Sequence, residues 1–113
     1  MNNPFETKTE YIKWADSAET AISQLILHYI EDTRKQNMCP LCYLDVFFKK
    51  AHSPNEKCIY CPHFVLLNAN CFNTFNKQYK KARNRHSLHF RKNRVINLNK
   101  LLILLRESKE NYV

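Results

Sequence analysis

The sequence predicts a mainly α-helical protein, a small single domain of about five helices clasped by a four-cysteine zinc site. Three observations predict it. Apolar residues recur at helical spacing along most of the 113 residues, two C-x2-C pairs are present, and glycine is absent. Tight hairpins and left-handed helix caps favour glycine, so its absence argues against a β-rich zinc ribbon and against such caps. The length fits one domain over residues 1–113.

A long amphipathic helix is expected over residues 8–36, after a loose tail at 1–6. Thr7, with Glu10 three positions later, forms a capping-box pattern at its start. Apolar residues then return in alternating steps of four and three, namely Tyr11, Ala15, Ala18, Ile22, Leu25 and Tyr29, with Trp14, Ile26 and Ile30 beside them. His28 falls on this side and is expected in the core. We expect the stripe to pack on the chain's own core, and its heptad-like spacing leaves open a homodimer through helix 8–36.

Two short helices are expected over residues 41–51 and 62–68. Pro40 and Pro62 precede them or begin them, and proline suits the first helical position. The first carries a helically spaced apolar set, Leu41, Leu44, Phe48 and Ala51. A turn is expected at 53–56 and a break at 68–70.

The C-terminal half is expected to form two more helices. The first, over residues 71–85, has Phe72, Phe75, Tyr79 and Ala82 on one face. The second, over 93–110, buries Val95, Leu98, Leu102 and Leu105, with Leu101 and Leu104 alongside. Residues 86–92 fit a loop or a continued helix. Phe90 is the one aromatic residue that we expect to be free to stack on a nucleic-acid base.

The two cysteine pairs predict a metal site. Cys39-Pro40-Leu41-Cys42 is followed, after fifteen residues, by Cys58-Ile59-Tyr60-Cys61. Two such knuckles supply four thiolates and leave no open position, which is typical of structural zinc. The predicted ligands are Cys39, Cys42, Cys58 and Cys61. The alternatives are that Cys71, His52 or His63 replaces one of them, that an iron–sulfur cluster takes the four thiolates, or that the cysteines are ordinary core residues.

Cysteine use and hydropathy also predict the compartment. The sequence shows no secretory signal, and its longest apolar run, residues 101–105, is far below the roughly 18 residues that span a bilayer. We therefore expect a cytoplasmic protein with no membrane partner. In the cytoplasm thiols stay reduced, so paired cysteines there more often bind metal than form disulfides. Frequent asparagine, lysine and isoleucine indicate an AT-rich genome, such as that of a bacteriophage or a low-GC bacterium.

Charge is unevenly distributed along the chain. The net charge is +8, yet residues 57–106 carry eleven Lys/Arg and no Asp/Glu, whereas residues 1–56 carry six Lys/Arg and eight Asp/Glu. Nine of the eleven lie in the basic region, residues 77–100. Such self-repulsion destabilises a fold unless an anion opposes it, so the basic region predicts a nucleic acid or an acidic protein surface as partner. A solvated helix face is the alternative.

These features predict a small zinc-binding accessory or regulatory protein that binds nucleic acid through a basic helical surface. The residues expected to contact phosphates are Lys77, Lys80, Lys81, Arg83, Arg85, Arg91, Lys92 and Arg94. One alternative is a protein-binding module, for example a phage factor that binds or inhibits a host protein through the basic surface and the leucine-rich last helix. A virion or assembly component is the third option. No catalytic residues are predicted, because the basic half lacks carboxylates that could make an open metal site for a nuclease.

Overall fold

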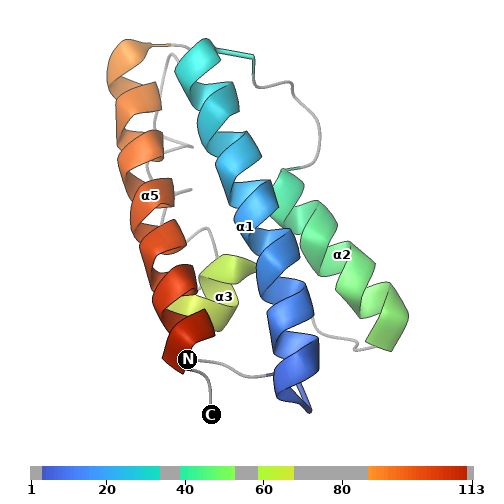
Figure 1. Cartoon of the computed structure of the whole chain (residues 1–113). Coiled ribbons are helices and arrows are strands. Elements are labelled where there is room, and N and C mark those ends of the chain that lie inside the picture. The colour runs from blue at the N-terminus through green and yellow to red at the C-terminus, as the bar shows by residue number, and fades with distance from the viewer. Residues whose placement is uncertain (1–3, 34–38, 53–58, 68–86, 112–113) are drawn as a thin grey trace.

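The computed structural model describes residues 4–33, 39–52, 59–67 and 87–111. These residues form four helices and no strand (Figure 1): α1, Lys8–Glu31; α2, Pro40–His52; α3, Pro62–Leu67; and α5, Leu88–Asn111. The mainly helical class is therefore confirmed. The predicted helix over 71–85, the turn at 53–56 and the break at 68–70 lie outside the described residues.

Helices α1 and α5 lie side by side and run in opposite directions, so the end of α1 is beside the start of α5 (Figure 1). Helix α2 packs on another side of α1, and the short α3 packs against α5. Helix α1 is therefore the central element, and its sides that face α2 and α5 need apolar residues.

The apolar stripe of α1 forms the core. Its buried residues are Tyr11, Trp14, Ala15, Ala18, Ile22, Leu25 and Tyr29. They join buried residues of the other helices, Leu41, Leu44, Phe48, Val65, Leu98, Leu101, Leu102 and Leu105. Since the chain's own helices cover the stripe, it packs on the chain's own core, as expected. Ile30 was expected beside the stripe, but it is 58% exposed.

The start of α1 follows the predicted capping pattern. The Thr7 hydroxyl accepts a hydrogen bond from the N–H of Glu10 at 3.1 Å, and the Glu10 carboxylate accepts one from the N–H of Glu6, also at 3.1 Å. The Thr7 hydroxyl thereby satisfies one donor of the first turn, and Glu10 ties the residue before the cap to the helix.

The end of α1 differs from the prediction. The helix ends at Glu31 rather than at residue 36, because Asp32 takes the left-handed conformation with φ 56° and its N–H bonds to the carbonyl of His28. Aspartate reaches this conformation more readily than most residues. The expectation that a chain without glycine avoids left-handed caps is therefore wrong here.

Phe5, which precedes α1, belongs to the core. Phe5 is buried and its ring packs against Tyr11, Trp14 and Tyr60, with ring centroids 5.4, 5.1 and 5.7 Å apart. This contact of a residue before the cap with the first turns resembles a hydrophobic staple. The expected loose tail over 1–6 is therefore wrong at Phe5.

Helix α5 begins earlier than expected. Ser87 caps it, since its hydroxyl accepts a hydrogen bond from the N–H of Phe90 at 3.2 Å, so residues 88–92 continue the helix. Phe90 is buried and packs edge-to-face on Tyr29, with centroids 6.3 Å apart, so it is not free to stack on a base. His28, which we expected in the core, is exposed and its Nδ1 lies 2.7 Å from the Thr33 hydroxyl.

Candidate metal centre and nucleic-acid interface

Three of the four predicted zinc ligands lie in the described residues, each in or beside the first turn of a helix. Cys39 precedes α2, and its carbonyl accepts hydrogen bonds from the N–H groups of Cys42 and Tyr43 at 2.9 and 3.0 Å. Cys61 precedes α3, and its carbonyl accepts one from the N–H of Val65 at 3.0 Å. Pro40 and Pro62 are the first residues of these helices, as predicted. Cys58, Cys71 and the side chain of His52 lie outside the described residues.

The backbone of Tyr60, the residue before Cys61, is tied to α1 and α2. The Tyr60 N–H donates to the Asp45 carboxylate at 2.8 Å, and the Tyr60 carbonyl accepts from the Trp14 indole at 2.8 Å. Both bonds are buried. Asp45 lies one turn after Cys42 on α2, so the residue before Cys61 is fixed against the helix that carries the first pair.

Sequence reasoning missed the roles of Trp14 and Asp45 in this arrangement. Asp45 follows Leu44 and precedes Phe48 by three residues, so it is a charged residue at the edge of the apolar face of α2. A buried carboxylate needs donors. Its position in the pattern was therefore a signal that a hydrogen-bond donor would lie opposite, without showing which one.

Within the described residues, side chains that could bind a metal come together as a pair, Cys61 and His63, rather than as a larger group. Among them, no group of three or more His, Cys, Asp or Glu side chains is placed to hold a metal ion. The Sγ of Cys61 and the Nδ1 of His63 lie 3.6 Å apart, and both residues are buried. Burial, with a smaller effect from the charge of Arg94, lowers the pKa of His63 to about 3. The imidazole is therefore neutral near pH 7, as a metal ligand must be.

Three of the eight predicted phosphate-binding residues lie in the described part of the chain. Lys77, Lys80, Lys81, Arg83 and Arg85 lie outside the described residues. Arg91, Lys92 and Arg94 lie on α5, and only Lys92 among these three is exposed. Lys100, the last residue of the basic region, is exposed as well.

The two arginines contact the last turn of α1. Nη1 of Arg91 donates to the carbonyls of Tyr29 and Ile30, both at 3.1 Å. The guanidinium of Arg94, which is 8% exposed, lies over the Tyr29 ring, 5.1 Å from its centroid. A cation suits the carbonyl end of a helix, where the backbone dipoles leave partial negative charge. Arg94 follows the buried Phe90 and precedes the buried Leu98 by four residues each, and this spacing was the sequence signal for its burial.

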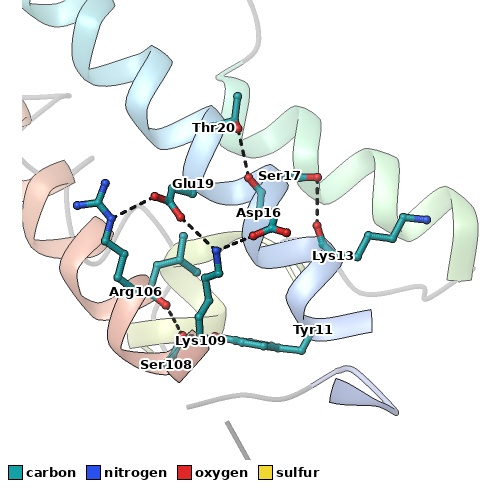
Figure 2. A network of polar contacts seen from close by, with 10 residues as sticks. Tyr11, Lys13, Asp16, Ser17, Glu19, Thr20, Arg106, Ser108 and Lys109 are labelled. Carbon is teal, nitrogen blue, oxygen red and sulfur yellow. Dashed lines mark hydrogen bonds and ion pairs between the residues drawn. The ribbon is translucent and has the colours of Figure 1, made fainter. Parts of the chain in front are cut away.

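Ion pairs join the other end of α5 to the first half of α1 (Figure 2). Lys109 contacts the carboxylates of Asp16 and Glu19, and Nε of Arg106 lies 3.1 Å from Glu19 Oε1. The hydroxyls of Tyr11 and Ser108 are hydrogen-bonded beside them. The hydrogen bond from Arg106 is the main cause that lowers the pKa of Glu19; burial opposes it and Lys109 adds to it.

An apolar groove of about 350 Å³ lies between the end of α1 and the start of α5. Ile30, Leu88 and Ile96 are each more than half exposed there, and Lys92 stands among them. The full lining is Tyr29, Ile30, Leu88, Arg91, Lys92, Val95 and Ile96.

Comparisons of the chain with protein-family models, with curated proteins and with solved structures found no match. Among the described residues, no helix has both the length and the apolar character that crossing a membrane requires. The function is therefore argued from the residues and their geometry.

Proposed function

We propose that the chain is a small zinc-stabilised helical protein, without catalytic activity of its own, that binds nucleic acid through the basic region, residues 77–100. One observation carries this proposal: residues 57–106 hold eleven Lys/Arg and no Asp/Glu. Fifty residues of one sign attract a polyanion, and phosphate contacts contribute most of such binding whatever the base sequence. The protein reads phosphates more than bases.

The charge pattern of α5 supports this surface. The ion pairs of α5 in the described part of the chain lie at Arg106 and Lys109, beside Asp16 and Glu19. Lys92 and Lys100 are exposed and belong to the part of the helix that precedes these pairs. The carboxylates of α1 therefore offset the C-terminal end of α5, and Lys92 and Lys100 remain for an external anion.

Zinc stabilises the fold in this proposal, through Cys39, Cys42, Cys58 and Cys61. The spacing of the two pairs supports it, and so does the bond between Asp45 and the N–H of Tyr60, which links the residue before Cys61 to the helix of Cys42. Structural zinc contributes roughly 10–16 kcal/mol of apparent binding energy in small domains. We expect one zinc per chain by elemental analysis, and we expect Cys42→Ser to lose both the metal and the helical circular dichroism. A metal-free chain that stays fully folded would contradict the structural role.

A salt-dependent gel-shift assay tests nucleic-acid binding. We expect Lys80→Glu combined with Lys81→Glu to abolish retention of DNA and RNA while the helical circular dichroism is unchanged. Lys92→Gln should weaken retention and reduce the salt slope by about 0.9 on duplex DNA, the value for one lost phosphate contact. Arg106→Gln, which removes a paired cation from the same helix, is the matched control and should keep the slope. Unchanged retention in the lysine variants would refute the proposal.

A protein-binding module is the second candidate, and the apolar groove beside Lys92 favours it. Ile30, Leu88 and Ile96 would supply apolar contact and Lys92 would attract an acidic partner. A pull-down from native lysate with and without nuclease separates the two functions. Partners that nuclease removes support nucleic-acid binding, whereas partners that survive nuclease support the protein-binding module.

A further inference from the structure

Cys39 and Cys42 lie on a single helical turn at the start of α2. The carbonyl of Cys39 accepts hydrogen bonds from the N–H groups of Cys42 and Tyr43, at 2.9 and 3.0 Å, so the chain between the two cysteines is coiled as a helix. Residues three apart on such a turn have Cα atoms about 5 Å apart. Disulfides join cysteines whose Cα atoms are about 4.4–6.8 Å apart. The backbone therefore holds the two cysteines at a separation that a disulfide can bridge.

Closing this bond needs a small movement at the end of the helix and none in its interior. Neighbouring Cβ atoms on a helix are about 5–6 Å apart, whereas a disulfide draws them to about 3.5–4.5 Å. Cys39 precedes Pro40, the first residue of α2, so it lies where the chain enters the helix. A shift of about 1–2 Å there brings the two Cβ atoms to the disulfide distance.

The same two cysteines are more accessible than the cysteine beside α3. Cys39 and Cys42 are half-buried, whereas Cys61 is 4% exposed and its Sγ lies 3.6 Å from Nδ1 of His63. The reaction of a thiol with an oxidant depends on access as well as on thiolate character. An oxidant that arrives from solvent therefore meets the pair on α2 before it meets Cys61.

We propose that Cys39 and Cys42 form a thiol–disulfide exchange site that reacts with low-molecular-weight disulfides of the glutathione class. One cysteine attacks the small disulfide, forms a mixed disulfide with one half of it and releases the other half as a thiol. The second cysteine then attacks the protein sulfur of the mixed disulfide, closes the bond between the two cysteines and releases the remaining half. The two protein thiols lose two electrons and two protons, and the small disulfide takes them up to become two thiols.

Oxidation of this pair has a consequence for metal binding. The thiolate is the form of cysteine that binds metal, so a disulfide withdraws both sulfurs. In the zinc site proposed above, Cys39 and Cys42 are two of the four ligands, and zinc and the disulfide therefore exclude each other. This consequence rests on the proposed zinc binding, whereas the exchange reaction does not. Zinc binding then depends on the ratio of small disulfides to thiols around the protein.

Mass spectrometry of the full chain after incubation with glutathione disulfide tests the proposal. The remaining thiols are alkylated and the chain is digested with trypsin, which cuts after lysine and arginine. Peptide 36–49 contains Cys39 and Cys42 and no other cysteine, whereas Cys61 lies in peptide 58–77. We expect peptide 36–49 to lose two hydrogen atoms and to carry neither an alkyl group nor glutathione, while Cys61 is still alkylated.

Three further measurements accompany the digest. A chromogenic chelator should detect zinc release in step with the disulfide, and an excess of reduced glutathione should restore both thiols. Cys39→Ser should leave Cys42 with glutathione attached, because no second sulfur lies on its turn to displace it. Urea is the control for access, since in the unfolded chain Cys61 should react as fast as the pair.

Every result supports or overturns the exchange site. Glutathione that stays attached to peptide 36–49 of the unaltered chain would overturn it, because the second cysteine then fails to reach the first. A bond between the two peptides, or equal reaction of Cys61 in the folded chain, would overturn it too. A chain that keeps its zinc and its thiols in excess glutathione disulfide would overturn the exchange site and leave the zinc role intact.

A disulfide within peptide 36–49 of a chain that holds no zinc would give the converse result. It would support the exchange site and overturn the proposed zinc role. All these readouts come from the unaltered chain, so they decide the matter even when Cys39→Ser fails to fold.

Discussion

Replacing Arg91 or Lys92 with glutamine removes one positive charge at adjacent positions of α5, yet we expect opposite results. Arg91 donates two hydrogen bonds to the last carbonyls of α1, whereas Lys92 is exposed. Arg91→Gln should therefore lower the free energy of unfolding and keep nucleic-acid retention. Lys92→Gln should lower retention and keep stability.

The magnitude for Arg91 follows from its contacts. A hydrogen bond from a charged donor contributes about 1.5–3 kcal/mol when it is buried. Arg91 is half-buried and one of its bonds is exposed, so solvent reduces the pair to about 1–2 kcal/mol in total. With a urea m-value of about 1–3 kcal/mol/M, the unfolding midpoint should fall by about 0.3–2 M.

Urea unfolding followed by circular dichroism measures this difference, with zinc at one fixed excess because a bound ligand shifts apparent stability. A gel shift on the same samples measures retention. Equal midpoints for the two variants would refute the view that Arg91 stabilises the end of α1. If both variants lost nucleic-acid retention equally, this would refute the view that Arg91 binds within the fold whereas Lys92 binds phosphate.

Three further changes test the fold. Trp14→Phe should cost about 1–3 kcal/mol in urea unfolding, because the buried carbonyl of Tyr60 loses its donor, and a change below about 0.3 kcal/mol would contradict that bond's role. Phe5→Ala should cost about 3 kcal/mol through lost ring packing, whereas a neutral result would return residue 5 to a loose tail. Glu19→Gln should cost about 0.2–1 kcal/mol at pH 7. Because the folded state lowers the pKa of Glu19, its contribution is present above about pH 4.5 and is lost as pH falls through the lower folded value, so thermal melts of the two proteins should converge in acid.

Local patterns predicted those elements that local physics determines. The stripe of α1, the Thr7 cap and the two prolines that begin α2 and α3 each depend on neighbours within a few residues, and all are confirmed. Helix α2 differs from its predicted range by one residue at each end.

The errors concern residues whose state depends on distant parts of the chain. Phe90 is buried because Tyr29 lies opposite it, and no local pattern in residues 86–92 reveals that neighbour. The spacing of Arg94 from Phe90 and Leu98 indicated its burial, but its place over the Tyr29 ring also requires α1 and α5 to be antiparallel, which no local pattern shows. The left-handed cap at Asp32 was missed for another reason: a compositional argument about glycine cannot exclude the few other residues that reach that conformation.

The candidate site could be predicted only in part. Spacing alone predicts the four cysteines to be a metal motif, but it could not show that the imidazole of His63 lies against Cys61. The position of Asp45 indicated a buried carboxylate that needs a donor, but not that this donor is a backbone N–H fifteen residues away.

The packing of α1 on α5 has a consequence for synthesis of the protein. Asp16 and Lys109, which meet in the folded state, are 93 positions apart in the chain. A ribosome adds about 5–20 residues per second. The apolar face of α1 that α5 covers in the folded protein therefore stays exposed for roughly 5–20 seconds after its own synthesis. A nascent chain is therefore exposed to chaperones and proteases during this interval. A stop codon or frameshift ahead of Leu98 would make that exposure permanent, and we expect such truncated products to aggregate or to be degraded.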